Sequence, residues 1–534
     1  MNAIELSIFS SRIEAVCEEM GLVLRRTSFS PNIKDRLDFS CALFDKTGKL
    51  FAQAAHIPVH LGSMAYAMEG IVGAMDWQPG DMLVLNDPYL GGTHLPDVTL
   101  VTPLFIEHII EGERQNELIA FVANRAHHAN IGGDAPGSMP LSTSLEQEGV
   151  IIAPCWILKQ GELQQQTLNL LSKIDSSIDP NNSEPVSLNS LVLADFAAQV
   201  STNQIGLERL EAMIEDAGVA NFRQGLEELN QYAQRLSSTI LQDIPDGSYL
   251  FDDLMDSDGA GTENIHIALK LTINKGKIHA DFTGTSPLVA GNINCPLSVA
   301  AAAVYYAFRC LMPEQTPACA GAFEDISITA PVGCLLNAER PAAVAAGNVE
   351  TSSRIVDVVL GALAQVIPDQ IPAASHGSMN NIAMGNHDSS NARRWDYYET
   401  VGGGMGANPV CDGLSALQTH MTNTLNTPIE SLEAHYPLRV KQYAIRRQSG
   451  GEGLHRGGDG IIRELEFLQD TEITLLTERR SNQPWGLNGG SAGLAGKNQL
   501  NSELLPAKCS RVVQAGDLLT LKTPGGGGWG SKHT

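Results

Sequence analysis

Basic residues are scarce in this sequence, and it has no long apolar run. Its 534 residues include 35 lysines and arginines against 60 aspartates and glutamates, which gives a net charge of −25. Nucleic acids and anionic membrane surfaces are bound by cationic surfaces, so this balance argues against both as partners. The most apolar run, 299–308, is far too short to span a bilayer. Charged residues interrupt the amino-terminal segment, so no leader peptide is predicted and we expect a soluble cytoplasmic protein.

Cysteine pairs with the spacing of a metal or redox site are also absent. The nine cysteines are scattered along the chain, and no C-x-x-C sequence occurs. Thiols of this kind are typical of reduced core residues in a cytosolic protein, and nothing marks one as a nucleophile.

A common nucleotide-binding signature is missing as well. No G-x-x-x-x-G-K-[ST] sequence is present, so the chain has no predicted phosphate loop. One G-x-S-x-G match occurs, at 489–493, but it lies in a glycine-rich loop and not at a predicted strand-to-helix turn, which leaves serine-hydrolase chemistry without an anchor. The 51 glycines, many of them in the last third, are more typical of turns and close backbone contacts than of phosphate binding.

The sequence does contain histidine and aspartate at the ends of two predicted strands. Residues 98–105 and 118–124 are expected to form an antiparallel hairpin, connected by the charged segment between them. His94 and Asp97 precede the first strand, and the pair His127-His128 follows the second. Because the start of one antiparallel strand lies beside the end of its partner, these side chains should meet at one end of a sheet.

Two imidazoles and a carboxylate are sufficient protein ligands for a catalytic divalent ion, because they leave positions open for water and substrate. Each motif alone is common by chance, and only their expected meeting favours a metal site over a polar strand end. Side chains alternate along a strand, so only one of His127 and His128 should be a ligand, and the sequence leaves open which. Imidazole and carboxylate ligands together favour manganese, iron or zinc.

Other polar residues are weaker candidates. His56 and His60 lie in HIPVHLGSM, where Pro58 argues against a regular helical turn, and an extended chain would place both on one side. We expect them to face substrate or to be structural. The charged cluster at 34–38 is expected to be solvated. Glu399, close to a run of three glycines, could line a pocket.

The predicted elements indicate a mixed α/β chain of the α+β class, with several lobes. A helix is expected at 3–26 and a polar surface connection at 174–189. We divide the chain into four regions: an amino-terminal α+β region with the metal-site hairpin (1–190), a helical segment (191–245), an α/β middle region (246–374) and a glycine-rich β-type carboxy-terminal region (375–534).

Long segments spread over residues 3–530 resemble one protein family, and they occur in the same order. They include RRTSFSPNIKDRLDFSCALFD, AAHIPVHLGSM, NDPYLGGTHLPDVTLVTPLF, NRAHHANIGGDAPGSMP, GNVETSSRIVD, YYETVGGGMGA and SGGEGLHRGGDGIIRE. The family is hydantoinase B, which includes the second half of ATP-dependent 5-oxoprolinases, the B-type component of ATP-dependent N-methylhydantoinases and the alpha-type component of acetone carboxylases.

The resemblance implies a division of labour that accounts for the missing phosphate loop. A hydantoinase A-type partner would bind ATP and phosphorylate the amide or enol oxygen of the substrate, and the B-type component would carry the metal and complete the reaction. The metal ligands would then be His94, Asp97 and a histidine of RAHH, with His127 favoured and Asp87 a candidate for a further ligand.

One position departs from the family. Many relatives have aspartate where this chain has Asn130, and Asp134 lies four residues later. If that carboxylate is a ligand or a base, Asp134 must take its role or the role is lost. Asp87, Asp134 or His128 would relay the proton of the attacking water.

The primary hypothesis is therefore the B-type component of an ATP-dependent cyclic-amide hydrolase, acting on 5-oxoproline or a hydantoin in a hetero-oligomer with an A-type ATP-binding partner. Two alternatives stay open: the alpha-type component of a ketone carboxylase, and a non-catalytic scaffold. The THLPD and HIPVHLGSM segments look more like the oxoprolinase and hydantoinase branch. The ring substrate, the metal and the stoichiometry also stay open at this point.

Overall fold

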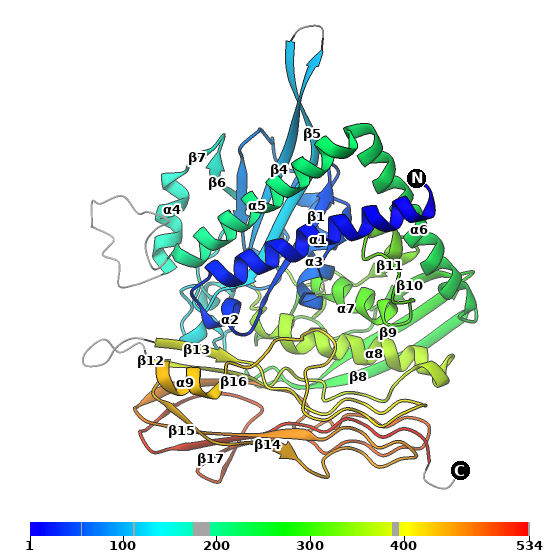
Figure 1. The fold of residues 1–534 in the computed structure, drawn as a ribbon. Helices are drawn as coiled ribbons and strands as arrows, with labels where there is room; N and C mark the ends of the chain where they lie inside the picture. The colour runs from blue at the N-terminus through cyan, green and yellow to red at the C-terminus, as the bar shows by residue number, and fades with distance from the viewer. Residues whose placement is uncertain (55, 111–112, 175–192, 387–394, 532–534) are drawn as a thin grey trace.

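The computed structural model describes residues 1–54, 56–110, 113–174, 193–386 and 395–531 (Figure 1). The fold is α+β, as the sequence predicts, with four sheets in the described residues. The connection predicted at 174–189 lies almost wholly outside these residues. In the described part of the chain, no helix has both the length and the apolar character that crossing a bilayer requires.

The amino-terminal sheet has seven antiparallel strands in the order β2-β1-β5-β4-β3-β6-β7. The predicted hairpin is confirmed: β4 and β5 pair with Asp97 opposite His127. Most of the charged segment predicted as their connection instead continues both strands, so the hairpin projects beyond the sheet in Figure 1. The strands are β1 (Phe39–Asp45), β2 (Leu50–Gln53), β3 (Met82–Leu85), β4 (Asp97–Ile110), β5 (Glu113–His127), β6 (Cys155–Lys159) and β7 (Glu162–Leu163).

Helices cover this sheet. The helix α1 (Ala3–Thr27), predicted at 3–26, begins with a capping box between Asn2 and Glu5. Figure 1 shows α1 running beside α5 across the sheet, and both contribute to one apolar core. The predicted helical segment is two helices, α5 and α6, which pack on this region. The helices are α2 (Pro31–Lys34), α3 (Pro58–Gly73), α4 (Gln165–Leu171), α5 (Ala194–Ala217) and α6 (Val219–Asp243).

The middle region has a four-stranded sheet in the order β11-β10-β9-β8, in which only β10 and β11 are parallel. The helix α8 packs on β8 and β9, and a single π-helical turn, Gly347–Thr351, precedes it. The elements are β8 (Gly247–Ser257), β9 (Glu263–Asn274), β10 (Lys277–Asp281), α7 (Leu297–Arg309), β11 (Ile326–Thr329) and α8 (Ser352–Ala364).

Two antiparallel sheets form the carboxy-terminal region, one in the order β13-β12-β16-β19 and the other in the order β14-β15-β20-β17-β18. Apolar side chains from both make a separate core. The elements are β12 (Asn381–Asn386), β13 (Trp395–Glu399), α9 (Ile429–His435), β14 (Leu438–Arg446), β15 (Gly460–Phe467), β16 (Thr471–Leu476), β17 (Lys497–Leu500), β18 (Glu503–Leu505), β19 (Lys508–Val513) and β20 (Leu518–Lys522).

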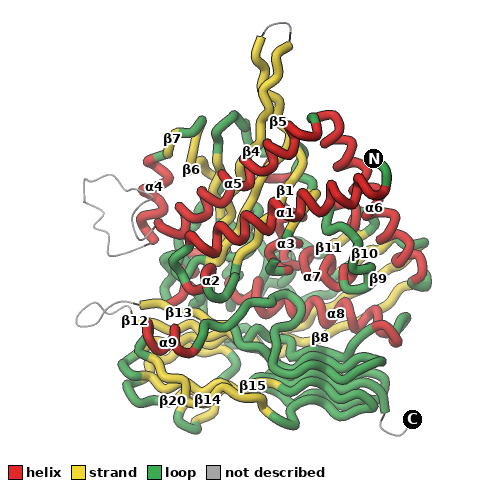
Figure 2. The backbone as a smooth tube through the Cα atoms, in the orientation of Figure 1, coloured by secondary structure: helices red, strands yellow, loops and turns green. Residues whose placement is uncertain are grey.

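Beside these sheets, extended glycine-rich segments lie side by side as a layered set of loops (Figure 2). We call this the glycine stack and define it by residues 402–406, 449–458, 490–493 and 525–528. Its segments are joined by backbone hydrogen bonds, such as Gly458 N to Met405 O at 2.8 Å and Gly451 N to Gly526 O at 2.8 Å. A Cβ atom on Gly526 would overlap the Met405 carbonyl, so close backbone approach requires glycine there.

Candidate metal centre

Four buried side chains meet where the β4–β5 hairpin enters the sheet. Asp97 begins β4, and His127 ends β5 directly opposite it. The Oδ1 atom of Asp97 lies 3.0 Å from His94 Nε2 and 3.3 Å from His127 Nδ1. His60, in the first turn of α3, places its Nε2 atom 3.2 Å from the other oxygen of Asp97. We call these four residues the His-Asp cluster.

The donor set of the cluster fits a metal ion. The Nδ1 atom of His94 lies 3.1 Å from the Ala345 carbonyl oxygen, which can only accept, so Nδ1 carries the proton. In the neutral imidazole, the Nε2 lone pair then faces Asp97 Oδ1, and neither atom has a hydrogen bond among the described residues. Two buried lone pairs at 3.0 Å repel each other unless a proton or a cation lies between them. Ligand atoms of His94, Asp97 and His127 all lie within 4.8 Å of one another, as one ion would require.

Asp97 is held as an anion with one oxygen free. Its Oδ2 atom accepts hydrogen bonds from Thr93 Oγ1 at 2.6 Å and Asn348 Nδ2 at 3.1 Å. Burial raises the pKa of Asp97, but the imidazoles of His60 and His94 outweigh burial and hold that pKa well below its usual range. The remaining oxygen, Oδ1, is therefore available as a charged ligand.

The orientation of the His127 ring is fixed by its packing against Tyr398. The ring is stacked on Tyr398, with 5.0 Å between the ring centroids and 6° between the planes. Burial lowers the pKa of His127, which favours the neutral imidazole that a metal ligand must be.

Asp38 extends the cluster, although no sequence motif pointed to it. Its two carboxylate oxygens lie 4.0 Å from His127 Nδ1 and 3.9 Å from His60 Nε2. Within the charged cluster at 34–38, which was predicted to be solvated, Arg36 is 0% and Asp38 only 6% exposed, so that prediction is wrong for both. Asp38 directly precedes β1, which pairs with β5, so the register of that pair could have placed it beside His127.

His60 belongs to the cluster, although it was predicted only to face substrate or to be structural. Pro58 was expected to prevent a helical turn, but it is the first residue of α3. Proline is favoured at that position, because its missing N–H has no partner within the helix in any case. The helical start places His60 beside Asp97, whereas the His56 ring accepts a hydrogen bond from Cys41 N.

His128 points away from the cluster. Its Nε2 atom lies 2.9 Å from Gln199 Oε1, and its ring packs on Phe196 with 4.3 Å between the centroids. The alternation of side chains along β5 is the reason. The contacts of His128 do not suit the proton relay predicted for it.

Asp87 and Asp134 are also not part of the cluster. Asp87 accepts a hydrogen bond from Tyr89 N at 3.0 Å and pairs with Arg340, so it caps a 3₁₀ turn and does not approach His94. The side chain of Asp134 is exposed, and its backbone N–H donates to Gln147 O at 2.9 Å. Neither residue has the geometry of the ligand or base predicted for it.

His56 and Glu399, predicted to face substrate, have structural partners. The Nδ1 atom of His56 accepts a hydrogen bond from Cys41 N at 3.1 Å, and burial lowers the pKa of His56 to about 4. Glu399 is fully buried and forms a two-point ion pair with Arg463, at 2.9 and 3.0 Å, while the Tyr397 hydroxyl donates to it at 2.7 Å. Glu399 is thus a structural anion and not a pocket residue.

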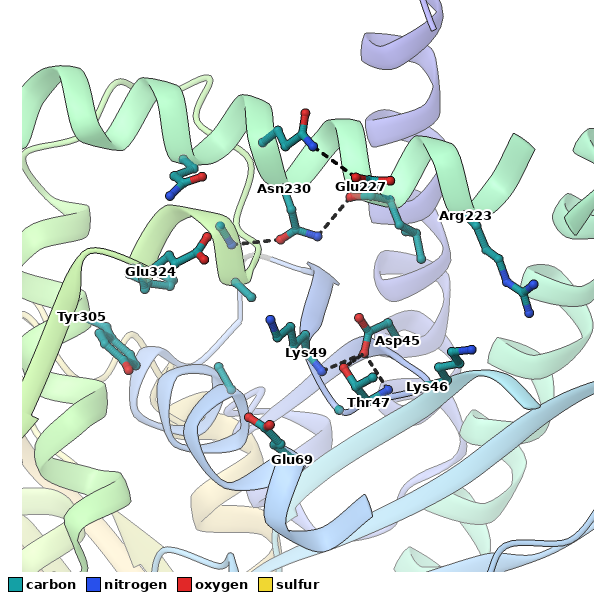
Figure 3. A pocket seen from close by; sticks show the side chains of 18 of the residues that line it. Asp45, Lys46, Thr47, Lys49, Glu69, Arg223, Glu227, Asn230, Tyr305 and Glu324 are labelled. Atoms are coloured by element: carbon teal, nitrogen blue, oxygen red, sulfur yellow. Dashed lines mark hydrogen bonds between the residues drawn. The ribbon is translucent and has the colours of Figure 1, made fainter. Parts of the chain in front are cut away.

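A surface cavity of about 650 Å³ lies elsewhere, over the β1–β2 turn (Figure 3). Its charged side chains are of both signs, and none belongs to the His-Asp cluster. They are Asp45, Lys46, Lys49, Glu69, Arg223, Glu227 and Glu324. Asp45 is used locally, because its carboxylate accepts hydrogen bonds from the Thr47 and Lys49 backbone.

Comparison with known proteins gives one family over nearly the whole chain. The family model described as Hydantoinase B/oxoprolinase matches residues 2–532. A 5-oxoprolinase from Arabidopsis thaliana is 40% identical over 99% of this chain, and the chain spans 42% of that protein's length. The B component of a putative D-/L-hydantoinase from Pseudomonas sp. (strain NS671) is 31% identical over 99% of this chain and 90% of its own length.

Solved structures of the same fold exist. A chain in the crystal structure of the ATP-dependent caprolactamase from Pseudomonas jessenii superposes with a TM-score of 0.88 and 25% identity, over 99% of this chain and 91% of that one. A chain of nucleotide-free acetone carboxylase superposes with a TM-score of 0.83 over 99% of this chain and 76% of that one. At 18% identity the latter shows a common fold alone.

Proposed function

The chain belongs to the hydantoinase B/oxoprolinase family, and from this we propose that it is the B-type component of an ATP-dependent cyclic-amide hydrolase. The relatives named as 5-oxoprolinase and as a hydantoinase B component, together with the fold shared with caprolactamase, support hydrolysis of a ring amide. The observation that carries the proposal is the buried His-Asp cluster, because ring opening needs an activated water.

The residues that would hold a divalent ion are His94, Asp97 and His127. When bound, a manganese, iron or zinc ion would supply Lewis-acid activation of water and of the amide carbon. The protein's part is to orient the ligand atoms. The Ala345 carbonyl accepts from His94 Nδ1 and so turns Nε2 toward the site, and Thr93 and Asn348 orient Asp97.

We assign proton uptake to Asp38 and His60, in place of Asp134 and His128. Asp38 Oδ1 lies 3.9 Å from His60 Nε2, which itself lies 3.2 Å from Asp97 Oδ2. A base must lie within reach of the attacking water, directly or through one further water. Asp38 and His60 satisfy that condition for water bound at Asp97, whereas the exposed Asp134 does not.

ATP chemistry is assigned to a partner. The sequence has no phosphate loop, and the 5-oxoprolinase from Arabidopsis thaliana has more than half of its length outside the matched region. We propose that a hydantoinase A-type partner phosphorylates the ring-amide oxygen in a hetero-oligomeric complex. Phosphorylation makes the amide carbon a better electrophile, and this chain would then complete the cleavage of the ring C–N bond.

The test is turnover by the chain assembled with its A-type partner, in ¹⁸O-labelled water with ATP. We expect ring opening of 5-oxoproline or a hydantoin, label from water in the new carboxylate, and no dependence on bicarbonate. Bicarbonate-dependent turnover of a ketone, with no ring amide opened, would move the chain to the carboxylase branch. A purified chain that holds no metal would instead favour the scaffold alternative.

A further inference from the structure

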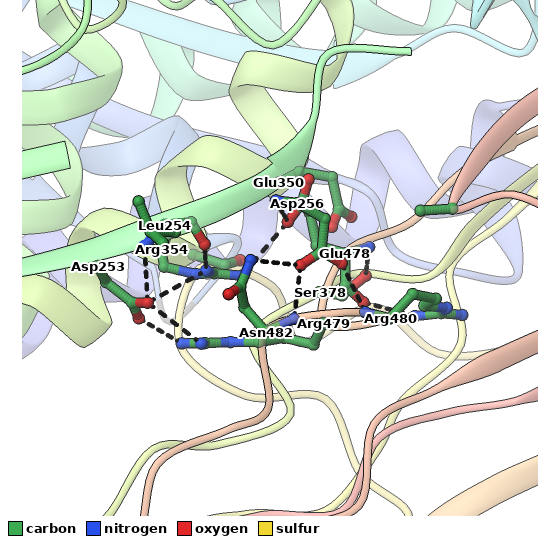
Figure 4. Close-up of polar contacts among 12 residues, drawn as sticks. Asp253, Leu254, Asp256, Glu350, Arg354, Ser378, Glu478, Arg479, Arg480 and Asn482 are labelled. Carbon is green, nitrogen blue, oxygen red and sulfur yellow. Dashed lines mark hydrogen bonds and ion pairs between the residues drawn. The ribbon is translucent and has the colours of Figure 1, made fainter. Parts of the chain in front are cut away.

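One helical turn joins the His-Asp cluster to a buried ion network. The π-helical turn Gly347–Thr351 places Asn348 against Asp97, with a distance of 3.1 Å from its Nδ2 atom to Oδ2. Two residues later, Glu350 enters the network in Figure 4, beside Glu478, Arg354 and Arg480. Single π turns are frequent at functional sites, because the wider turn directs side chains differently from an α-helix.

Glu350 is buried and uses only one of its oxygens. Its Oε1 atom accepts hydrogen bonds from Met379 N at 2.8 Å and from Asn381 Nδ2 at 2.7 Å. Its Oε2 atom has no hydrogen bond among the described residues. Burial and the neighbouring Glu478 raise the pKa of Glu350 to about 7, against the opposite effect of Lys508. A buried carboxylate with one unpaired oxygen lowers the stability of the fold, so a role beyond accepting two hydrogen bonds would account for its presence.

Glu350 determines which way the Asn381 amide faces. The Nδ2 atom of Asn381 donates to Glu350 and also to the Leu476 carbonyl oxygen at 2.7 Å, and both of these groups are acceptors. The amide oxygen must therefore face the other way, where it accepts from the Tyr398 hydroxyl at 2.6 Å. Without Glu350, one of the two acceptors that fix this orientation is lost.

Tyr398 packs its ring against the His127 ring. Its ring is stacked on the His127 ring, and the Arg36 guanidinium lies 4.9 Å from its centroid. Arg36 also donates to the Tyr398 carbonyl at 2.7 Å. The Tyr398 hydroxyl donates to Asn381 Oδ1, and this hydrogen bond fixes the end of the Tyr398 ring that lies opposite its backbone.

We propose that Glu350 is a positioning residue of the metal centre, which acts through the Asn381 amide and the Tyr398 hydroxyl to hold the Tyr398 ring against His127. The proposal rests on the metal site of the proposed function, and not on the identity of the ring substrate. It assigns a role to a buried carboxylate that touches neither metal ligands nor substrate.

The test is a double-mutant cycle on metal affinity, with cobalt(II) as the probe. Glu350→Met removes both acceptor oxygens, and we expect it to weaken binding by about 10- to 100-fold, as is usual for residues that orient ligands. Tyr398→Phe removes the hydroxyl through which Glu350 acts, and should weaken binding by at least as much as Glu350→Met. The double variant should be no weaker than Tyr398→Phe, because both changes break the same chain of contacts. Glu350→Gln, which still offers an oxygen to both N–H groups, should restore the affinity and the cobalt absorption spectrum.

Asp253→Asn is the matched control. Asp253 belongs to the same buried network but pairs with Arg479, at 2.7 Å, and with Arg354. We expect that variant to lower the unfolding temperature and to leave cobalt affinity unchanged. Equal losses of affinity in Asp253→Asn and Glu350→Met would show a general effect of the network and overturn the proposal. Additive effects of Glu350→Met and Tyr398→Phe would also overturn it.

A second readout does not need a metal. In the ¹⁵N-histidine-labelled chain, Tyr398→Phe should shift the His127 ring signals, and Asp253→Asn should not. Unchanged His127 signals in Tyr398→Phe would overturn the positioning role, even if Glu350→Met fails to fold. A wild-type chain that binds no cobalt would overturn the proposed metal site, and the His127 signals of Glu350→Met would still decide whether Glu350 positions that ring.

Discussion

The His-Asp cluster and the glycine stack bury polar groups in opposite ways. In the cluster, charged and imidazole side chains converge from strand ends and a helix start. Among the described residues, one ring nitrogen each of His94 and His127 and one oxygen of Asp97 have no hydrogen-bond partner. In the stack, most residues are glycine, and backbone N–H and C=O groups satisfy one another between distant segments. The cluster thus has polar atoms available for a ligand, whereas the polar backbone groups of the stack bond to one another. Substitutions should therefore separate function from folding according to region.

The largest effect is expected for His94→Ala. That change removes a proposed ligand whose ring contacts Ala345, Asp97 and His127. We expect bound metal to fall by more than about 100-fold in affinity and ring-opening activity to disappear, while the circular dichroism spectrum stays that of the wild type. Elemental analysis of the purified variant measures this. His435→Ala is the control, since His435 is exposed on α9. Equal metal content in His94→Ala and wild type would remove His94 from the site.

Gly526→Ala should do the reverse and damage the fold. The added Cβ would overlap the Met405 carbonyl, and two hydrogen-bonded backbone segments would have to separate. We expect the free energy of unfolding to fall by about 3 kcal/mol or more, the upper end for overpacking. Gly70→Ala is the control, because Gly70 is exposed in α3 with open space around it. Alanine there should stabilise the helix by about 0.5–1 kcal/mol. Urea midpoints of both variants give the comparison, and a tolerated Gly526→Ala would show that the stack can relax.

The two regions also differ in how far the sequence could predict them. His94, Asp97 and His127 could be brought together, because strand alternation and hairpin pairing are local rules. Asp38 needed the register of β1 with β5, which joins residues far apart in the chain. The prediction for His60 was wrong because Pro58 was taken to break a helix, whereas proline is also favoured at the first position of one.

The long-range partners were out of reach altogether. Glu399 and Arg463 are 64 residues apart, and only the folded sheets show that they pair. Clustered glycines predicted close backbone contacts, but not that Gly451 would meet Gly526. Hydrophobic pattern specifies elements and their near neighbours, and the pairing of distant loops depends on the whole core.

A smaller effect, on the pH dependence of stability, should come from Glu148. This residue is a buried side chain, as in the cluster, but its partners are backbone N–H groups. Its Oε1 atom accepts from the backbone N–H groups of Val344 and Ala345 at 2.9 Å, and so holds the segment whose carbonyl orients His94. Burial raises the pKa of Glu148 from an ordinary value of 4.5 to about 7. Below pH 4.5 the carboxyl is protonated in the folded and unfolded states alike, and it does not make stability depend on pH. Between pH 4.5 and 7 the unfolded state loses the proton first, so stability falls as pH rises, by at most about 3 kcal/mol.

Glu148→Gln should remove that dependence while keeping an oxygen for both N–H groups. The difference in unfolding free energy between wild type and variant should therefore grow in favour of the variant from pH 4.5 to 7, and level off above pH 7. Glu350, whose pKa is raised to the same range, contributes to both proteins and cancels in the difference. Glu146→Gln, at an exposed position in the same 3₁₀ turn, is the control and should follow the wild-type curve. Parallel curves for wild type and Glu148→Gln would mean that Glu148 is ionised in the fold. Its negative charge would then stabilise the backbone N–H groups behind His94, and the cluster would be supported electrostatically and not by a neutral carboxyl.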